Sequence, residues 1–109
     1  MLNRIILMGR LTKNPTIRKA GDQSNYVCFS IAVDRDVPNR NGERITDFFD
    51  CVAWRQLANH IFNYYKKGDS IIVEGRMMQR KYIDENKIER TIYEVQVDNA
   101  NFPERKIKT

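Results

Sequence analysis

Alternation of apolar and polar residues predicts five β-strands along this chain. They span residues 3 to 12, 26 to 34, 47 to 55, 69 to 84 and 88 to 97, because residues two apart on a strand share one face. The clearest strand, residues 26 to 34, carries an apolar row on one face, formed by Val27, Phe29, Ile31 and Val33. In the last strand, we expect an inward row of Tyr93, Val95 and Val97.

A change in the apolar period predicts one helix between the third and fourth strands. In "RQLANHIFNYYKKG", residues 55 to 68, the apolar residues at helical spacing are Leu57, Ala58, Ile61, Phe62 and Tyr65. Lys66 and Lys67 fall in the last predicted turn, and Gly68 provides the stop signal.

Turn and bend signals separate and shape the strands. Pro38 and the pair Asn41-Gly42 predict an exposed hairpin loop over residues 35 to 45, and the polar residues 84 to 87 predict a second turn. Gly9 and Gly75 lie inside strands, at positions where a small barrel has to bend. These signals favour long, curved hairpins.

The order of three strands, one helix and two strands indicates the fold class. We predict an all-β protein with one short helix, a five-stranded Greek-key barrel of the OB type with the helix between strands three and four. An SH3-like barrel and an α+β sandwich stay open from the pattern alone. We expect one OB-fold domain over residues 1 to 103 and a short charged tail over residues 104 to 109.

Composition and charge narrow the function. A formal net charge of +5 and a pI near 9.4 favour an anionic partner. Cys28 and Cys51 sit in apolar strand patterns without CxxC spacing, which predicts buried, reduced thiols. His60 is the single histidine, and no paired carboxylates or glycine-rich loop occur, so we expect no enzyme, metal site or cofactor. Without a long apolar run or signal peptide, we expect a soluble cytoplasmic protein with no membrane partner and no small-molecule substrate.

The third strand, "DFFDCVAWR", carries aromatic residues on both faces. Alternation places Phe48 and Trp54 on the outward face. The inward row consists of Phe49, Cys51 and Ala53. The even-numbered positions of the first and fourth strands add cationic and aromatic residues, namely Arg4, Arg10, Arg76, Arg80 and Tyr82.

This mixture of side chains suits single-stranded nucleic acid. A core does not usually hold four arginines, and a purely solvated face does not usually carry so many large aromatics. Bases stack on aromatic rings for about 1–3 kcal/mol each without regard to sequence, while cations follow the phosphates. Two alternatives stay open: Phe48, Trp54 and Tyr82 form an apolar subunit interface rimmed by arginines, and Lys66-Lys67 is a helix cap rather than a phosphate contact.

Several sequence blocks resemble the bacterial-type single-stranded DNA-binding protein family over about residues 2 to 103. They are "LNRIILMGRLTKNPTIR", "FSIAVDRD" with "NGE", "DFFDCVAWRQLA", "YYKKGDSIIVEGRMMQRKY" and "YEVQV". The resemblance implies an OB-fold protein that coats single-stranded DNA in replication, recombination and repair. It further implies a homotetramer, with a dimer as the alternative, and neither catalysis nor a cofactor.

The resemblance also implies roles for individual residues. The family's stacking aromatics fall on Phe48, Trp54 and Tyr82. Resemblance and pattern together give the candidate phosphate contacts Arg4, Arg10, Arg55, Lys66, Lys67, Arg76, Arg80 and Lys81. Ile6 and Met8, apolar residues on the cationic face of the first strand, are candidates for a subunit interface.

The chain departs from the family in three places. Val37 lies where some members carry a further stacking aromatic, and Asp50 stands between Phe48 and Trp54. The chain stops at "ERKIKT", so we expect no acidic C-terminal tip that recruits replication or repair proteins. Two other functions stay open: a protein-interaction module of a replication-restart assembly with weak DNA binding, and an OB-fold RNA binder.

Overall fold

The structure, a computed structural model, describes residues 1–103. This part of the chain contains six β-strands and one α-helix. The elements are β1 Ile5–Leu11, β2 Thr16–Lys19, β3 Asn25–Asp34, β4 Thr46–Trp54, α1 Arg55–Tyr64, β5 Ser70–Ile83 and β6 Glu89–Asn101. The predicted charged tail, residues 104–109, lies outside the described residues. No helix of the described part is long and apolar enough to cross a lipid bilayer.

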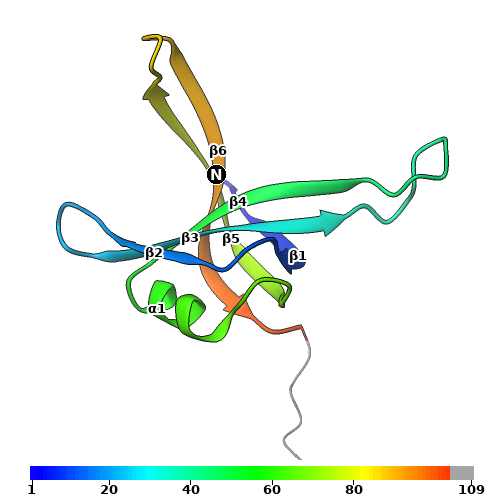
Figure 1. Ribbon diagram of the computed structural model, residues 1–109, viewed down its shortest axis with the longest axis horizontal. Coiled ribbons are helices and arrows are strands. Elements are labelled where there is room, and N and C mark those ends of the chain that lie inside the picture. Colours follow the sequence, from blue (N-terminus) through cyan, green and yellow to red (C-terminus); the bar gives the residue numbers. More distant parts are fainter. Residues whose placement is uncertain (104–109) are drawn as a thin grey trace, which may run out of the picture.

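The strands close into a barrel (Figure 1). Their order is β1-β5-β6-β4-β3-β2, and a further pairing of β1 with β3 joins the ends of the ring. Arg10 faces Ala32 where β1 meets β3, and Cys51 faces Val95 in the one parallel pairing found in the described chain, between β4 and β6. Five strands therefore form a closed ring with α1 between its third and fourth strands, which confirms the predicted OB-type barrel.

Strand β2 is absent from the five predicted strands. It pairs antiparallel with the outer edge of β3, from Thr16 opposite Cys28 to Lys19 opposite Asn25. With four residues and Ile17 as its single apolar side chain, it is too short to produce an alternating pattern. This segment is a strand only because it pairs with β3, and a local sequence pattern does not contain that contact.

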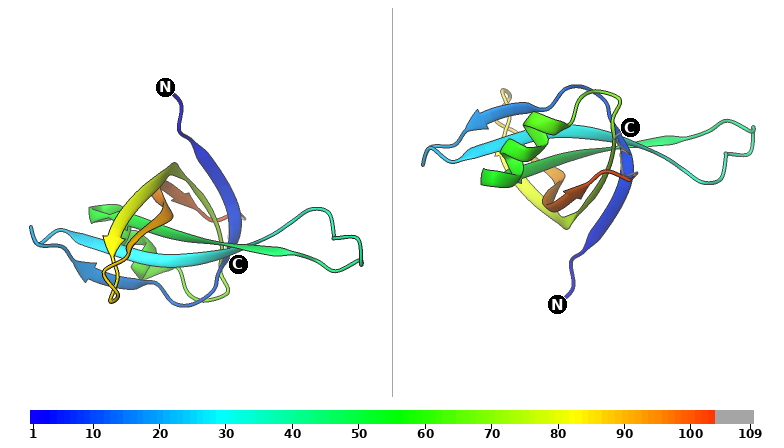
Figure 2. Two further views of the ribbon diagram at one scale, coloured as in Figure 1. Left: turned by 90° about the horizontal axis from the view of Figure 1, so that it is seen from above. Right: turned by 90° about the horizontal axis from the view of Figure 1, so that it is seen from below.

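One face of the barrel strands forms the core. Its buried side chains include Phe29 and Ile31 of β3, Cys51 and Ala53 of β4, and Ile71 and Val73 of β5. Ala58 and Ile61 of α1 add to it from one end of the barrel, where α1 lies across the strands (Figure 2). The predicted inward row of β4 is confirmed, since Phe49 also packs against this cluster.

The prediction for Tyr93 is wrong. Val95 and Val97 are buried as expected, whereas the Tyr93 side chain is 62% exposed. Tyr93 lies opposite Gln79 in the outer part of the β5–β6 hairpin, which projects beyond the barrel (Figure 1). Alternation predicts which face a residue occupies, but not whether the rest of the fold covers that face.

Gly9 and Gly75 mark close approaches between strands, as predicted. A Cβ atom on Gly9 would collide with the carbonyl oxygen of Ala32, and one on Gly75 with that of Gln96. The pairing of β5 with β6 also shifts register between Glu74 and Gly75. Glycine therefore allows β1 to meet β3 and β5 to bend along β6.

The helix ends earlier than predicted, so Lys66 and Lys67 do not lie in its last turn. Buried Tyr65 has extended backbone angles and ends the helix, and its N–H still donates to Ile61 O at 3.1 Å. The N–H of Lys66 then donates to Asp69 Oδ2, and that of Lys67 to Asn14 Oδ1, each at 2.8 Å. The helix-cap interpretation of the lysine pair is therefore wrong.

The β3–β4 and β5–β6 hairpins project from the barrel in different directions (Figure 1). The first holds the loop of residues 35–45, where Gly42 has φ of 77° and its N–H donates to Asn39 O at 3.0 Å. This confirms the turn predicted at Asn41-Gly42. In the β5–β6 hairpin, Asp84 accepts hydrogen bonds from the N–H groups of Asn86 and Ile88.

Candidate nucleic-acid interface

The outer face of β3 and β4 carries the predicted aromatic row. The facing pairs are Tyr26 with Trp54, Cys28 with Val52, Ser30 with Asp50 and Ala32 with Phe48. Phe48 is 67% exposed and Trp54 is 39% exposed, as the alternation predicted. Val52 shares their face but is buried, since Cys28 and Gln96 flank it on the neighbouring strands. The two exposed rings lie six residues apart on one strand, which corresponds to about 20 Å.

Tyr26 is a member of this surface that the sequence analysis missed. Its ring lies against Trp54, with centroids 4.9 Å apart and planes inclined by 32°. Such an offset, tilted contact is favourable for aromatic rings. The signal was present in the sequence, because Tyr26 begins the outward row of its strand, but only the register of β3 with β4 places it opposite Trp54.

Tyr82 lies on the β5–β6 hairpin, on the same face as Arg80. It is 42% exposed and pairs across the hairpin with Arg90. Arg90 Nε donates to Asp84 Oδ2 at 2.8 Å. This bond, together with the N–H donors of the turn, lowers the pKa of the Asp84 carboxyl below its ordinary value. The charged carboxylate thus organises the turn beside Tyr82.

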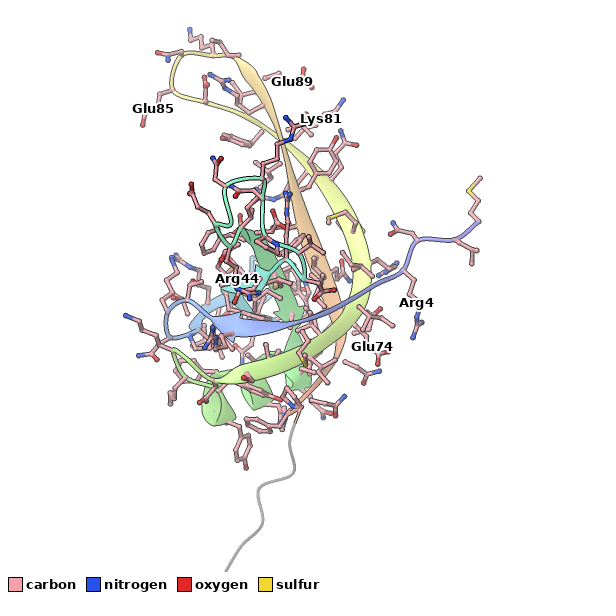
Figure 3. All side chains as sticks on the ribbon, turned by 90° about the vertical axis from the view of Figure 1, so that its right-hand side faces the viewer. Arg4, Arg44, Glu74, Lys81, Glu85 and Glu89 are labelled. Carbon is pink, nitrogen blue, oxygen red and sulfur yellow. The ribbon has the colours of Figure 1, made fainter. Side chains whose placement is uncertain are left out.

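Four of the eight predicted phosphate contacts are already paired with carboxylates. Their N···O distances are Arg4–Glu74 2.9 Å, Arg10–Asp34 3.8 Å, Arg80–Glu94 3.4 Å and Lys81–Glu89 3.6 Å. Figure 3 shows Arg4 beside Glu74, and Lys81 near Glu89 on the projecting hairpin. The four cationic side chains are between 59% and 70% exposed, although Glu94 is only 22% exposed. An ion pair at the surface is worth only about 0–1 kcal/mol. An incoming phosphate can therefore replace the carboxylate at small cost.

The other four predicted contacts make no ion pair within residues 1–103. They are Arg55, Lys66, Lys67 and Arg76, and all are exposed. Arg55 directly follows Trp54 and has φ of 59°, a left-handed conformation that favours glycine. Lys66 Nζ lies 5.8 Å from the centre of the Phe62 ring. Arg76 lies on the outer face of β5, opposite Gln96.

A groove of about 280 Å³ crosses this face and draws on every barrel strand except β1. Its lining includes Arg18 of β2, Cys28 of β3, Asp50 of β4, Arg80 of β5 and Glu94 of β6. Asp50 stands between Phe48 and Trp54 along β4, as expected. The ion-pair partner of Arg80 in this groove is Glu94 rather than Asp50. The sequence analysis missed Arg18 because strand β2 was not predicted. It missed Glu94 because only the inward row of the predicted strand over residues 88 to 97 was used.

The two cysteines differ in exposure. Both are free, and Cys51 is buried, where burial raises its thiol pKa to about 12. The prediction for Cys28 is wrong, because this side chain is exposed on the outer face of β3. Partial burial in the groove is the main cause that raises the Cys28 pKa, and the carboxylate of Glu94 adds to it.

The candidate interface residues Ile6 and Met8 lie on β1, the strand of the ring that does not line this groove. Ile6 is 58% exposed and Met8 is 61% exposed. They face Glu74 and Ile72 across the β1–β5 pairing. The structure therefore leaves two large apolar side chains of β1 uncovered.

The fold and this surface define a class of protein, an OB-fold barrel whose outer face combines exposed aromatic rings with cationic side chains. The sequence comparisons identify the family. The chain belongs to the single-strand binding protein family, whose model matches residues 2–103.

Individual relatives agree with this assignment. The chain is 40% identical over 106 residues to single-stranded DNA-binding protein A of Bacillus subtilis (strain 168). It is also 40% identical to single-stranded DNA-binding protein 2 of Listeria monocytogenes, and 37% identical to the single-stranded DNA-binding protein of Lactiplantibacillus plantarum. The matches cover 97%, 97% and 100% of this chain, and 62%, 66% and 54% of the three relatives. The chain thus spans between half and two thirds of their lengths.

Proposed function

We propose that this protein binds single-stranded DNA without sequence preference. The observation that carries the proposal is the outward row of β4, where Phe48 and Trp54 present exposed rings beside cations. Tyr82 supplies a third ring from the β5–β6 hairpin. Membership of the single-strand binding family supports this ligand, and it supports a binding protein rather than an enzyme. Stacking on a ring is worth about 1–3 kcal/mol per base and tolerates every base.

Two groups of cations hold the phosphates in this proposal. Arg55, Lys66, Lys67 and Arg76 make no ion pair within residues 1–103 and bind phosphates directly. The second group exchanges a carboxylate for a phosphate, and it consists of Arg4, Arg10, Arg80 and Lys81. Contacts of this kind make affinity fall as salt rises, because each neutralised phosphate releases counterions.

Binding of labelled oligo-dT, followed by fluorescence anisotropy, tests the proposal. The wild-type protein should bind, and Trp54→Ala with Tyr82→Ala should weaken binding by about 2–6 kcal/mol while the fold is retained. A wild-type protein that ignores oligo-dT would overturn the proposal and leave the protein-interaction module as the better account. Competition with oligo-U decides between DNA and RNA, since an RNA binder would prefer the 2′-hydroxyl ligand.

We also propose a homo-oligomer, with a tetramer expected from the family resemblance and a dimer as the alternative. Exposed Ile6 and Met8 support a subunit contact through β1. Light scattering on the free protein measures its mass against the 12.9 kDa of one chain. Met8→Glu should lower that mass, because it places a charge in the apolar contact. The proposed setting is the cytoplasm of a bacterium, in replication, recombination and repair, as the family resemblance implies; the relative from Bacillus subtilis supports a bacterial setting.

A further inference from the structure

Strand β2 places an arginine in line with the Tyr26–Trp54 pair. Arg18 faces Tyr26 across the β2–β3 pairing, and Tyr26 faces Trp54 across the β3–β4 pairing. Residues that face each other across paired strands lie on the same side of the sheet. The three side chains therefore form one row on the outer face, spanning three neighbouring strands.

Within this row, Tyr26 restricts the Trp54 ring. The centroid distance of 4.9 Å means that the phenol ring covers part of the indole. Trp54 is still 39% exposed, so part of its surface remains available to a base. A ring held in place before binding loses less side-chain freedom when the ligand arrives.

Arg18 supplies a free charge at the end of the row. Its side chain is exposed and makes no ion pair within residues 1–103. It lines the same groove as Arg80. The pKa of the Cys28 thiol is raised by burial and by Glu94, and both guanidinium groups offset part of that rise. The groove therefore has cations on both β2 and β5, while the carboxylates of Asp50 and Glu94 lie on β4 and β6.

We infer that the DNA path extends across β2, with Tyr26 as a positioning residue for Trp54 and Arg18 as a phosphate contact. Two strand spacings separate Arg18 from Trp54, about 10 Å at the backbone. An arginine side chain can cover much of this distance toward the phosphate of a nucleotide stacked on the indole. This inference rests on the proposed single-stranded DNA binding and adds residues to that same site.

A pair of neighbouring variants tests Arg18. Arg18 and Lys19 are adjacent, equally charged and exposed, but they lie on opposite faces of β2. Salt titrations of oligo-dT binding should show that Arg18→Gln makes the slope of log K against log salt shallower by about 0.7. Lys19→Gln should leave the slope at its wild-type value. Equal effects of the two variants would overturn the role of Arg18, because charge alone would then explain them.

Tyr26 is tested by variants that separate positioning from folding. Tyr26→Val should weaken oligo-dT binding about threefold to tenfold and make Trp54 fluorescence in the free protein more accessible to acrylamide. Tyr26→Phe keeps the ring and should restore both properties, since the hydroxyl group is not part of the contact. Thermal melting of both variants checks the fold. Wild-type affinity in Tyr26→Val, or lost affinity with unchanged acrylamide quenching, would overturn the positioning role.

The controls also distinguish this inference from the proposed function. If the wild-type protein binds oligo-dT and Trp54→Ala weakens binding, the proposed function stands. If both Arg18→Gln and Tyr26→Val then behaved like the wild-type protein, Arg18 would not contact the DNA and Tyr26 would not position Trp54. The proposed function would stand unchanged. Failure of the wild-type protein to bind would remove both.

Discussion

Arg80 Nε on β5 lies 3.4 Å from Glu94 Oε1 on β6, in the groove that also contains Asp50. The predicted phosphate contact is thus held by a carboxylate of the neighbouring strand before DNA arrives. A phosphate that binds Arg80 has to displace Glu94 and then lies near two negative charges. Glu94 therefore opposes DNA binding in this account.

Removal of that charge should strengthen binding. We expect Glu94→Gln to raise the affinity for oligo-dT about twofold to fivefold, because a phosphate then no longer competes with the carboxylate for Arg80. The ion pair joins a 59% exposed side chain to a 22% exposed one, and a pair at the surface is worth about 0–1 kcal/mol. Anisotropy titrations at low salt measure the change. Glu85→Gln is the matched control, since Glu85 carries the same charge at the exposed hairpin tip and makes no ion pair within the described chain (Figure 3). An equal gain in both variants would show that net charge, rather than release of Arg80, is responsible.

Phe48 should matter for binding but little for stability. Its side chain is 67% exposed, so Phe48→Ala removes few core contacts. We expect a loss of about 1–3 kcal/mol in oligo-dT binding and a change in unfolding free energy within about 0.5 kcal/mol. Tyr93→Ala is the matched control, because Tyr93 is 62% exposed but lies outside the aromatic row. If only Tyr93→Ala weakened binding, the stacking surface would lie on the face of the β5–β6 hairpin that carries Tyr93, and not on β4.

Arg55 allows a test of backbone strain beside the site. Its φ of 59° costs a residue with a Cβ atom about 1–2 kcal/mol, a penalty that glycine avoids. Arg55→Gly should therefore be more stable than Arg55→Ala by about 1 kcal/mol in urea unfolding. Both variants should weaken oligo-dT binding to a similar extent, since both lose the charge. If the alanine variant were the more stable one, strain at this position would be refuted.

The two thiols should react very differently with a disulfide reagent. We expect one reactive thiol per native chain, Cys28, and two after unfolding in guanidinium. Burial raises the Cys51 pKa to about 12 and hides the sulfur, so its thiolate is scarce and inaccessible at neutral pH. The pKa of Cys28 is also raised, so its reaction should accelerate as pH increases and more thiolate forms.

Cys28 also reports on the DNA path. It lines the groove beside Arg18 and Arg80, so bound oligo-dT should slow its modification. Cys28→Ser should show no reactive thiol in the native state. Modification of Cys28 at the same rate with saturating oligo-dT would mean that DNA does not cover the groove.

Much of the barrel was predictable because its strands carry strong alternation. The inward row Phe49, Cys51 and Ala53 and the outward pair Phe48 and Trp54 follow directly from a period of two. The bends at Gly9 and Gly75 could also be predicted, because a glycine inside a strand often marks a position where two strands approach closely.

What the sequence did not predict depends on contacts between distant residues. The position of Tyr26 against Trp54 requires the β3–β4 register, and the pairing of Arg80 with Glu94 requires that of β5 with β6. The early end of α1 also depends on distant contacts. Tyr65 follows the last helical residue, is buried, and its ring stacks on that of Phe102 with centroids 4.3 Å apart. Such choices depend on tertiary packing, which local pattern does not contain.

Titration of Trp54 fluorescence with oligo-dT over a series of salt concentrations tests the central claim most directly. The chain has a single tryptophan, so the signal comes from the proposed stacking platform alone. We predict strong quenching on binding, and an affinity that falls with salt at a slope of about −0.7 per neutralised phosphate. Fluorescence that is unchanged by saturating oligo-dT, at any salt concentration, would contradict the account.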